Sequence, residues 1–264
     1  MNNVYTHGHH ESVLRSHSWR TAGNSAGYLL PQLRPGQSLL DIGAGPGTIT
    51  ADLARLVQPG RTTALEANES ALDITRATFA QLDISVDFVV GDVHHLDLPD
   101  DSFDVVHAHQ VLQHVADPVQ ALREMRRVCK PGGIVAARDS DYQAFAWFPE
   151  LPELTEWMTL YQRLARANGG EPDAGRRLLS WALEAGFEKV EATASNWTFT
   201  TDEDRAWWGG MWADRILQSA MAKQALASGV PQETLDGISK AWQTWAADPA
   251  AFISLLHGEI LATA

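Results

Sequence analysis

A glycine-rich turn that follows an apolar run contains residue types able to bind a ligand. The segment reads Leu39-Leu40-Asp41-Ile42-Gly43-Ala44-Gly45-Pro46-Gly47-Thr48. Because glycine lacks a Cβ atom, a ligand can lie directly against the main chain of such a turn. Apolar residues then recur at helical spacing at Ile49, Leu53 and Leu56, so a helix begins here and points its first N–H groups at the ligand. The pattern predicts a nucleotide-type cofactor site at the carboxyl end of a parallel strand.

The spacing of the glycines distinguishes between kinds of cofactor. A dinucleotide-binding turn reads G-x-G-x-x-G, and counted from Gly43 its third glycine would stand where this chain has Thr48. A P-loop needs a lysine after its last glycine, and none lies near. An NAD-dependent reductase on a similar sheet is therefore disfavoured. This chain also lacks the Tyr-x-x-x-Lys pair of such reductases, because the residue four positions after Tyr142 or Tyr161 is alanine.

Acidic residues follow the next two predicted strands. The second predicted strand, 63–67, contains Glu66 near its end. This acid lies at the distance after the turn where a carboxylate accepts from both ribose hydroxyls. A third apolar run, 86–90, leads to Asp92. The elements that follow are a loop and a fourth strand over 98–106 continuing into 109–118, a helix at 121–128, a turn at 130–133 and a fifth strand at 134–137.

This ordered set resembles the class I S-adenosylmethionine-dependent methyltransferases, and most of all the branch related to ubiquinone and menaquinone biosynthesis methyltransferases. The resemblance is specific across about residues 36–140 and weaker elsewhere. It implies a Rossmann-like α/β fold, with a seven-stranded sheet whose last strand is antiparallel and helices on both faces. It also implies S-adenosyl-L-methionine as cofactor and methyl transfer as the activity.

The resemblance assigns a part of the cofactor to each residue of the predicted site. These residues are Asp41, Gly43, Ala44, Gly45, Gly47, Glu66, Ala67, Asp92, Val93 and Gln110. The acid and the glycines of the turn would hold the methionine part. Glu66 would bind the ribose hydroxyls, with Ala67 beside the adenine. Asp92 would accept from the adenine amino group and Val93 would supply a backbone N–H. Gln110 would contact the methionyl ammonium through its carbonyl.

Composition limits the other possibilities. The 264 residues suffice for one domain with an inserted cap, and the net charge of −13 makes a nucleic-acid partner unfavourable. No apolar leader and no run of about 18 apolar residues is present, so we expect a cytoplasmic protein without a membrane span. Cys129 is the only cysteine and predicts no disulfide or thiolate cluster. The oligomeric state is left open.

The first 35 residues are expected to form an arm ahead of the core at 36–140. Polar and aromatic residues crowd into it at Tyr5, His7, His9, His10 and His17. Three interpretations compete: a solvated tail, a lid, or a metal site at 7–10, which no thiol ligand accompanies. We expect no metal. Related methyltransferases often close their site with an N-terminal helix, here 12–30. Tyr5 would then contact the cofactor, His10 the substrate, and Arg20 the cofactor carboxylate, unless Arg20 forms only a surface salt bridge.

The C-terminal third predicts a helical insertion before the last strand. The expected elements are helices at 150–167 and 176–184, a strand at 189–200, helices near 203–227 and 232–246, and a closing strand at 251–261. We interpret 201–248 as a cap that faces the substrate. Trp207, Trp208, Met211 and Trp212 either pack this cap onto the sheet or form an aromatic wall for an apolar or planar acceptor.

Candidate residues for the chemistry lie at the carboxyl edge of the sheet. If the acceptor is a hydroxyl, a general base helps, and His114 is the candidate. His109, nearer the strand, is interpreted as structural. The expected substrate-binding residues are His10, Asp139, Tyr142, Trp208, Trp212 and His257. We expect a small-molecule acceptor, with oxygen preferred over nitrogen or carbon. A cofactor-binding protein without catalysis stays an alternative.

Overall fold

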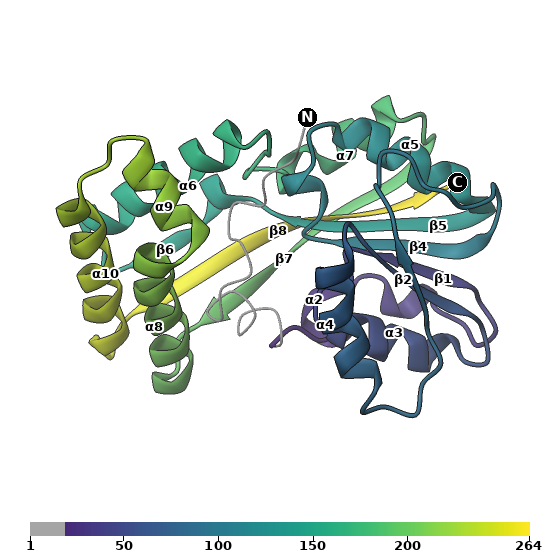
Figure 1. Ribbon diagram of the computed structural model, residues 1–264, viewed down its shortest axis with the longest axis horizontal. Coiled ribbons are helices and arrows are strands. Elements are labelled where there is room, and N and C mark those ends of the chain that lie inside the picture. The colour runs from purple at the N-terminus through teal and green to yellow at the C-terminus, as the bar shows by residue number, and fades with distance from the viewer. Residues whose placement is uncertain (1–18) are drawn as a thin grey trace.

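A sheet with helices on both faces organises the protein, for which a computed structural model describes residues 19–264 (Figure 1). Tyr5 and His10, and with them the histidine-rich stretch, lie outside the described residues. Of the helix expected over 12–30, the described part forms only α2 (Ala22–Ser25) and the 3-10 turn Leu30–Gln32. The side chain of Thr21 caps α2 by accepting from the Asn24 N–H, so this helix begins at residue 22.

The strands form the mostly parallel sheet that the resemblance implies, with one addition. Across the sheet they are β3 (Asp87–Val90), β2 (Thr62–Glu66), β1 (Leu39–Ile42), β4 (Phe103–His109), β5 (Cys129–Ser140), β8 (Phe252–Thr263) and β7 (Lys189–Phe199). Strand β8 is antiparallel to its neighbours, and the other neighbouring pairs are parallel.

The expected count of seven strands is wrong for the described residues, because a short strand, β6 (Ala146–Phe148), joins the sheet. Strand β5 pairs with β8 only as far as Ser140 opposite His257. Strand β5 therefore does not pair with the first residues of β8. Strand β6 pairs with them instead, from Phe148 opposite Phe252 to Ala146 opposite Ser254. Three residues followed by Pro149 are too short for a recognisable strand pattern.

Two hydrophobic clusters cover the two faces of the sheet. Successive residues of a strand point to opposite faces, so Leu39 packs with α2 and α3 (Thr48–Val57), whereas Leu40 packs with α5 (Pro118–Val128) and α7 (Leu178–Glu184). Figure 1 shows these helix pairs on opposite sides of the sheet, while α4 (Glu69–Phe79) packs on β2 and β3. Burial on both faces explains why the strands read as continuous apolar runs.

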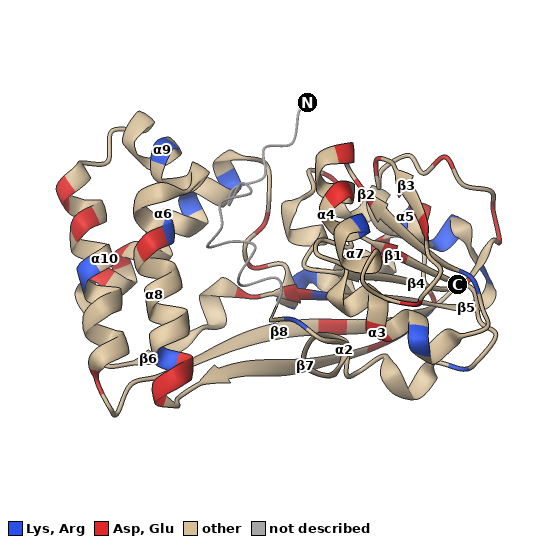
Figure 2. Ribbon diagram, turned by 60° about the horizontal axis from the view of Figure 1, so that its bottom comes forward, with Lys and Arg blue, Asp and Glu red and all other residues tan. Residues whose placement is uncertain are grey.

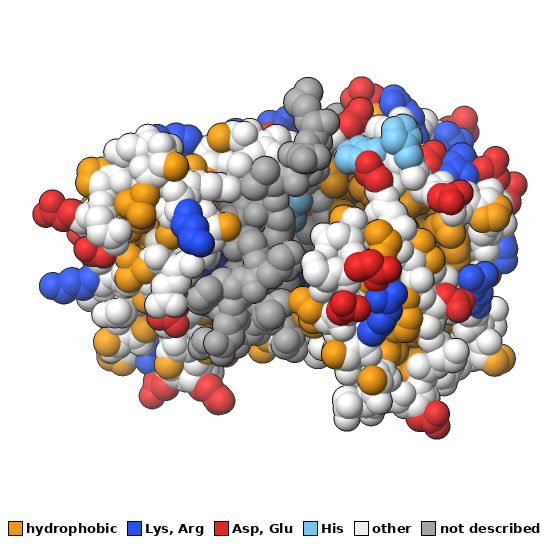
Figure 3. Space-filling model, viewed as in Figure 1, with side chains coloured by type: hydrophobic (Ala, Val, Ile, Leu, Met, Phe, Trp, Pro, Cys, Tyr) orange, Lys and Arg blue, Asp and Glu red, His pale blue; other side chains and the backbone are white. Residues whose placement is uncertain are grey.

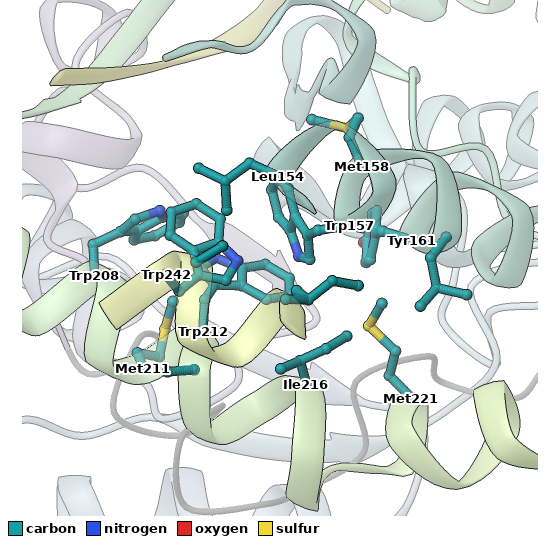
Figure 4. Packing of buried hydrophobic residues seen from close by; sticks show 14 of the residues in the cluster. Leu154, Trp157, Met158, Tyr161, Trp208, Met211, Trp212, Ile216, Met221 and Trp242 are labelled. Carbon is teal, nitrogen blue, oxygen red and sulfur yellow. The ribbon is translucent and has the colours of Figure 1, made fainter. Parts of the chain in front are cut away.

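A helical layer, made of α6 (Pro152–Ala167), α8 (Asp202–Gln218), α9 (Ala220–Ala227) and α10 (Gln232–Ala247), lies beyond one end of the sheet (Figure 1). Its core is aromatic: the Trp157 ring lies 4.7 Å from that of Trp212 and 4.9 Å from that of Trp242 (Figure 4). Helix α6 thus packs with the segment expected as the cap. The helix expected near 203–227 is two helices, because the backbone is extended at Ser219.

The long hairpin of β7 and β8 connects the sheet to the helical layer (Figure 1). Its pairing runs without interruption from Lys189 opposite Thr263 to Phe199 opposite Ile253. On the face shown in Figure 3, apolar side chains are interspersed with charged ones over both parts. Within residues 19–264, no helix is long and apolar enough to cross a membrane.

Candidate active site

A cavity of about 650 Å³ extends from the glycine-rich turn to helix α8. It brings together most of the residues predicted from the sequence. Those that line it are Arg20, Asp41, Gly43, Ala44, Gly45, Glu66, Ala67, Asp92, Val93, Gln110, His114, Tyr142, Trp208, Trp212 and His257. Gly47 and Asp139 are described but do not line it. The cavity therefore joins the carboxyl edge of the sheet to the helical layer.

The three glycines of the turn all have positive φ but serve different purposes. A Cβ at Gly43 would lie 2.5 Å from Val111 Cγ2, so this glycine permits close packing of the protein itself. At Gly45 the nearest atom would be 4.0 Å away, which leaves open space beside the main chain. A Cβ at Gly47 would lie 2.9 Å from Thr75 Cγ2, and Gly47 caps α3. Gly47 therefore allows α4 to approach the turn and does not line the cavity, and its expected contact with the cofactor stays a prediction.

The carboxylate of Asp41 is hydrogen-bonded to elements next to the turn. It is buried, and Thr50 Oγ1 donates to its Oδ2 over 2.5 Å. Its Oδ1 lies 2.7 Å from His107 Nδ1, and that ring is fully buried. Both oxygens are thus bound to neighbouring elements, α3 and β4, which hold the end of β1 in place.

Two carboxylates flank the turn on its open side. Glu66 Oε1 accepts from the Gly45 N–H over 2.5 Å, and burial raises the pKa of this carboxyl group although that hydrogen bond lowers it. Asp92 Oδ1 accepts from the His94 N–H over 2.9 Å and lies 2.6 Å from His94 Nδ1, and these contacts hold its pKa below the ordinary value. The turn therefore has hydrogen-bond acceptors at the ends of β2 and β3.

A hydrogen-bonded group formed by Gln110, Ser140 and His257 lies where β4, β5 and β8 meet. Gln110 Nε2 donates to Ser140 Oγ over 2.8 Å and lies 2.9 Å from His257 Nε2. His257 Nδ1 lies 2.9 Å from the Leu255 carbonyl, so Nδ1 carries the proton and Nε2 accepts. Both nitrogens of His257 are used, and the ring orients Gln110. The amide oxygen of Gln110 is then the group left to meet a donor.

His114 and Asp139 differ in their access to the cavity. His114 lines it, and burial together with the charge of Arg20 lowers its pKa to about 4, so the ring is neutral at pH 7. Asp139 is fully buried, its Oδ1 accepts from the Gln113 N–H over 3.1 Å, and burial raises its pKa to about 7. Asp139 does not line the cavity, because β5 turns this side chain toward the backbone at Gln113, and its expected contact with substrate stays a prediction.

The aromatic residues of the cavity also belong to the core of the helical layer. Tyr142 stacks on Tyr161 at 4.0 Å between ring centroids, and Trp208 stacks on Phe199 at 4.8 Å. Trp208 and Trp212 are 7% and 1% exposed, yet both line the cavity. The two interpretations of the tryptophan cluster, packing and cavity wall, therefore describe the same side chains.

Several lining residues were missed or assigned a structural role. They are Trp19, His109, Ser140, Phe145, Trp197 and Arg215. His109 is the last residue of β4, at the carboxyl edge of the sheet. Ligands of such sheets bind at this edge, and that rule alone could have selected His109 as a site residue. Trp197 lies on β7 and reaches the site only through the register of β7 with β8, which the sequence does not specify. The guanidinium of Arg20 lies 5.5 Å from the centre of the Trp197 ring.

Comparison with known proteins agrees with this geometry. A family model described as a methyltransferase domain matches residues 40–137. An uncharacterized methyltransferase of Schizosaccharomyces pombe is 31% identical over 268 residues, which are 97% of this chain and 95% of that protein. The ubiquinone/menaquinone biosynthesis C-methyltransferase UbiE of Vibrio campbellii is 34% identical over 175 residues, 60% of this chain and 67% of that protein.

A solved structure shares the fold over nearly the whole chain. The YcgJ protein of Bacillus subtilis superposes with a TM-score of 0.59 at 18% identity, covering 94% of this chain and 98% of that one. The sequence likeness and the shared fold together confirm the family that the motif order predicted.

Proposed function

Because this chain belongs to the methyltransferase family and is an S-adenosylmethionine-dependent enzyme, we propose that its acceptor is a small, apolar or aromatic molecule. One observation carries the proposal: a single cavity joins the glycine-rich turn to the aromatic side chains of α8. Oxygen is the first choice of target atom, with nitrogen and carbon as alternatives. Pockets lined mostly by aromatic side chains with few polar groups are typical sites for small molecules.

The residues of the turn fit S-adenosylmethionine. The open space beside Gly45 gives the main chain room to contact a ligand, and the first N–H groups of α3 face the same region. We assign the methionine part to this turn and to the amide oxygen of Gln110. We assign the ribose hydroxyls to Glu66 and the adenine to Asp92, whose carboxylates accept hydrogen bonds as those groups require.

Bound S-adenosylmethionine supplies a sulfonium methyl that is already activated for attack. The chain then has to align the acceptor in line with that methyl group, exclude water and receive a proton. Trp208, Trp212 and Tyr142 would bind the body of the acceptor. With the cofactor bound, these side chains would hold the acceptor atom toward the methyl group, and the acceptor proton would have to be received by the protein or by water. The neutral ring of His114 is the proposed proton acceptor.

The charge of the protein supports a small acceptor over a nucleic acid. The net charge is −13, and Figure 2 shows Lys and Arg scattered over the described ribbon together with acidic residues. A cytoplasmic location stays a prediction.

Two measurements test the function. Calorimetry with S-adenosylhomocysteine and with NADH separates a methyltransferase from a reductase, and we expect binding of the first only. Transfer of labelled methyl groups to a panel of small phenols, amines and acidic carbon compounds separates an enzyme from a silent binder. Binding of NADH in place of S-adenosylhomocysteine would contradict the proposal. Labelling of a macromolecule in a cell extract, with no small acceptor methylated, would contradict it as well.

A further inference from the structure

Two of the residues that line the cavity have buried ring nitrogens without a hydrogen-bond partner in the described structure. They are His109, at the end of β4, and Trp208, on α8. Both ring nitrogens of His109 and the indole Nε1 of Trp208 are buried and unbonded. The two residues are 6% and 7% exposed. Such groups cost free energy in a folded protein and need a specific explanation.

One other histidine and one other tryptophan that line the cavity do have partners, although the indole nitrogens of Trp157 and Trp242, outside the cavity lining, have none. His257 uses both of its ring nitrogens, on Gln110 and on the Leu255 carbonyl. The indole of Trp197, which also lines the cavity, donates to the Asn24 carbonyl over 2.6 Å. The fold can therefore satisfy histidine and tryptophan groups at this site. At His109 and Trp208 it does not, and both residues line the cavity.

We propose that His109 and Trp208 are acceptor-binding residues and that the acceptor has two oxygen functions, one for each of them. This inference rests on the proposed function and adds the substrate class to it. An indole N–H can only donate, so the group that meets Trp208 has to accept, as a carbonyl or ether oxygen does. The group that meets His109 is the hydroxyl to be methylated, because His109 adjoins Gln110, which we assign to the cofactor.

The surroundings of His109 suit a hydroxyl. Burial and the positive charges of Arg20 and Arg138 hold the pKa of His109 well below its usual range, and His257 and His107 act in the same direction. The imidazole therefore stays neutral, with one donor and one acceptor nitrogen. The donor nitrogen of His109 can bind a lone pair of the hydroxyl, which leaves the hydroxyl proton for His114, the proposed proton acceptor.

A run of aromatic rings joins the two polar positions. The His109 ring lies 5.8 Å from Trp197, which lies 5.3 Å from Trp19. Trp19 lies 5.3 Å from Phe199, which stacks on Trp208 at 4.8 Å. The part of the acceptor between its two oxygens is therefore planar and apolar, and both ends are polar.

Three naphthalenes test this class by calorimetry on enzyme saturated with S-adenosylhomocysteine. The first, 6-hydroxy-2-acetylnaphthalene, has both oxygens, 6-ethyl-2-naphthol lacks the carbonyl, and 2-acetylnaphthalene lacks the hydroxyl. We expect the first to bind about tenfold or more tightly than either of the others, because each missing oxygen leaves a buried partner unbonded. Equal binding of the three, or binding of none, would overturn the proposal.

Variants then assign each oxygen to its residue. We expect His109→Phe to remove the advantage of the hydroxyl and Trp208→Phe to remove the advantage of the carbonyl. Trp207→Phe, which changes another tryptophan of the cavity, is the matched control and should keep both. The melting temperature of His109→Phe should stay the same or rise, because an unbonded buried polar group is removed. Loss of affinity for all three probes alike would show a merely structural role.

The proposed function can fail separately. Labelled methyl transfer to 6-hydroxy-2-acetylnaphthalene is measured in parallel with binding. If the binding pattern is as expected and no methyl group is transferred, the roles of His109 and Trp208 in binding are supported and the methylation of this oxygen is refuted.

Discussion

Replacement of Gly45 by alanine separates backbone strain from loss of the ligand site. The residue has φ of +57°, where an L side chain costs about 1–2 kcal/mol, so the free energy of unfolding should fall by that amount. For a chain of this size the melting temperature should fall by roughly 2–8 °C. The new Cβ meets no protein atom nearer than 4.0 Å and so occupies the open space that we assign to the cofactor.

The loss of affinity follows from that position. Forcing a methyl group into a filled space costs about 1–3 kcal/mol, so S-adenosylhomocysteine should bind about 5- to 150-fold more weakly. Gly45→Val should abolish detectable binding. The assay is calorimetry, with melting curves of the unliganded proteins recorded alongside.

Gly132 offers a matched control for the strain. Its φ is +79°, a Cβ there would meet nothing within 4 Å, and it does not line the cavity. Gly132→Ala should therefore lose similar stability and keep full affinity. If Gly45→Ala binds S-adenosylhomocysteine as well as Gly132→Ala does, the cofactor does not lie against this turn and the assignment is wrong.

Three further predictions concern the acids and bases of the site and the arm. Glu66→Ala should weaken binding of S-adenosylhomocysteine by about 1–3 kcal/mol in calorimetry, and unchanged affinity would remove Glu66 from the site. His114→Ala should lower kcat about 10²- to 10⁴-fold. Since the pKa of His114 is about 4, the kcat of the wild type should fall with decreasing pH only well below pH 6.5. A small loss that pH does not alter would mean that His114 only shapes the pocket. A shortened chain beginning at Ser18 should fold, by circular dichroism, but turn over more slowly, whereas full activity would show that the histidine-rich stretch is a solvated tail.

Stability should depend on the same buried histidines. In the folded state the pKa of His114 is depressed, and those of His109 and His257 are depressed as well. The unfolded chain therefore binds more protons below about pH 6.5, and stability is lost as the pH falls through that value. Melting curves at pH 7 and pH 5 should show this loss. His109→Phe should make it smaller, and an equal loss in wild type and variant would contradict the reasoning.

The sequence could predict that the residues expected to bind the cofactor lie together, because their geometry is local. The turn at Gly43 and Gly45 immediately follows a strand, and Glu66 and Asp92 each end or follow the next strands. Parallel strands bring their carboxyl ends to one edge of the sheet, so position in the sequence determines position in space. Gly47 was expected beside the cofactor but does not line the cavity. In the sequence, a glycine that makes room for a neighbouring helix looks the same as one that makes room for a ligand.

The acceptor half depends on contacts between segments far apart in the sequence. Trp197 reaches the cavity through the register of β7 with β8, and Trp19 through its packing on Trp197 at 5.3 Å. Asp139 follows the same edge rule as Gln110, yet its side chain is buried against Gln113. Strand alternation within one residue of the edge decides which of these side chains enters the cavity, and composition gives no indication of that choice.

The helical layer couples acceptor binding to stability. Trp212 lines the cavity with one part of its ring system and packs against Trp157 and Trp242 with another. Removing such a side chain would cost both an aromatic contact for the acceptor and the cavity energy of a core truncation, about 3–5 kcal/mol. His109 and Trp208 are different, because their unbonded nitrogens can be removed while the ring shape is nearly kept. Changes of acceptor preference should therefore arise more readily at those two positions than at the buried tryptophans behind them.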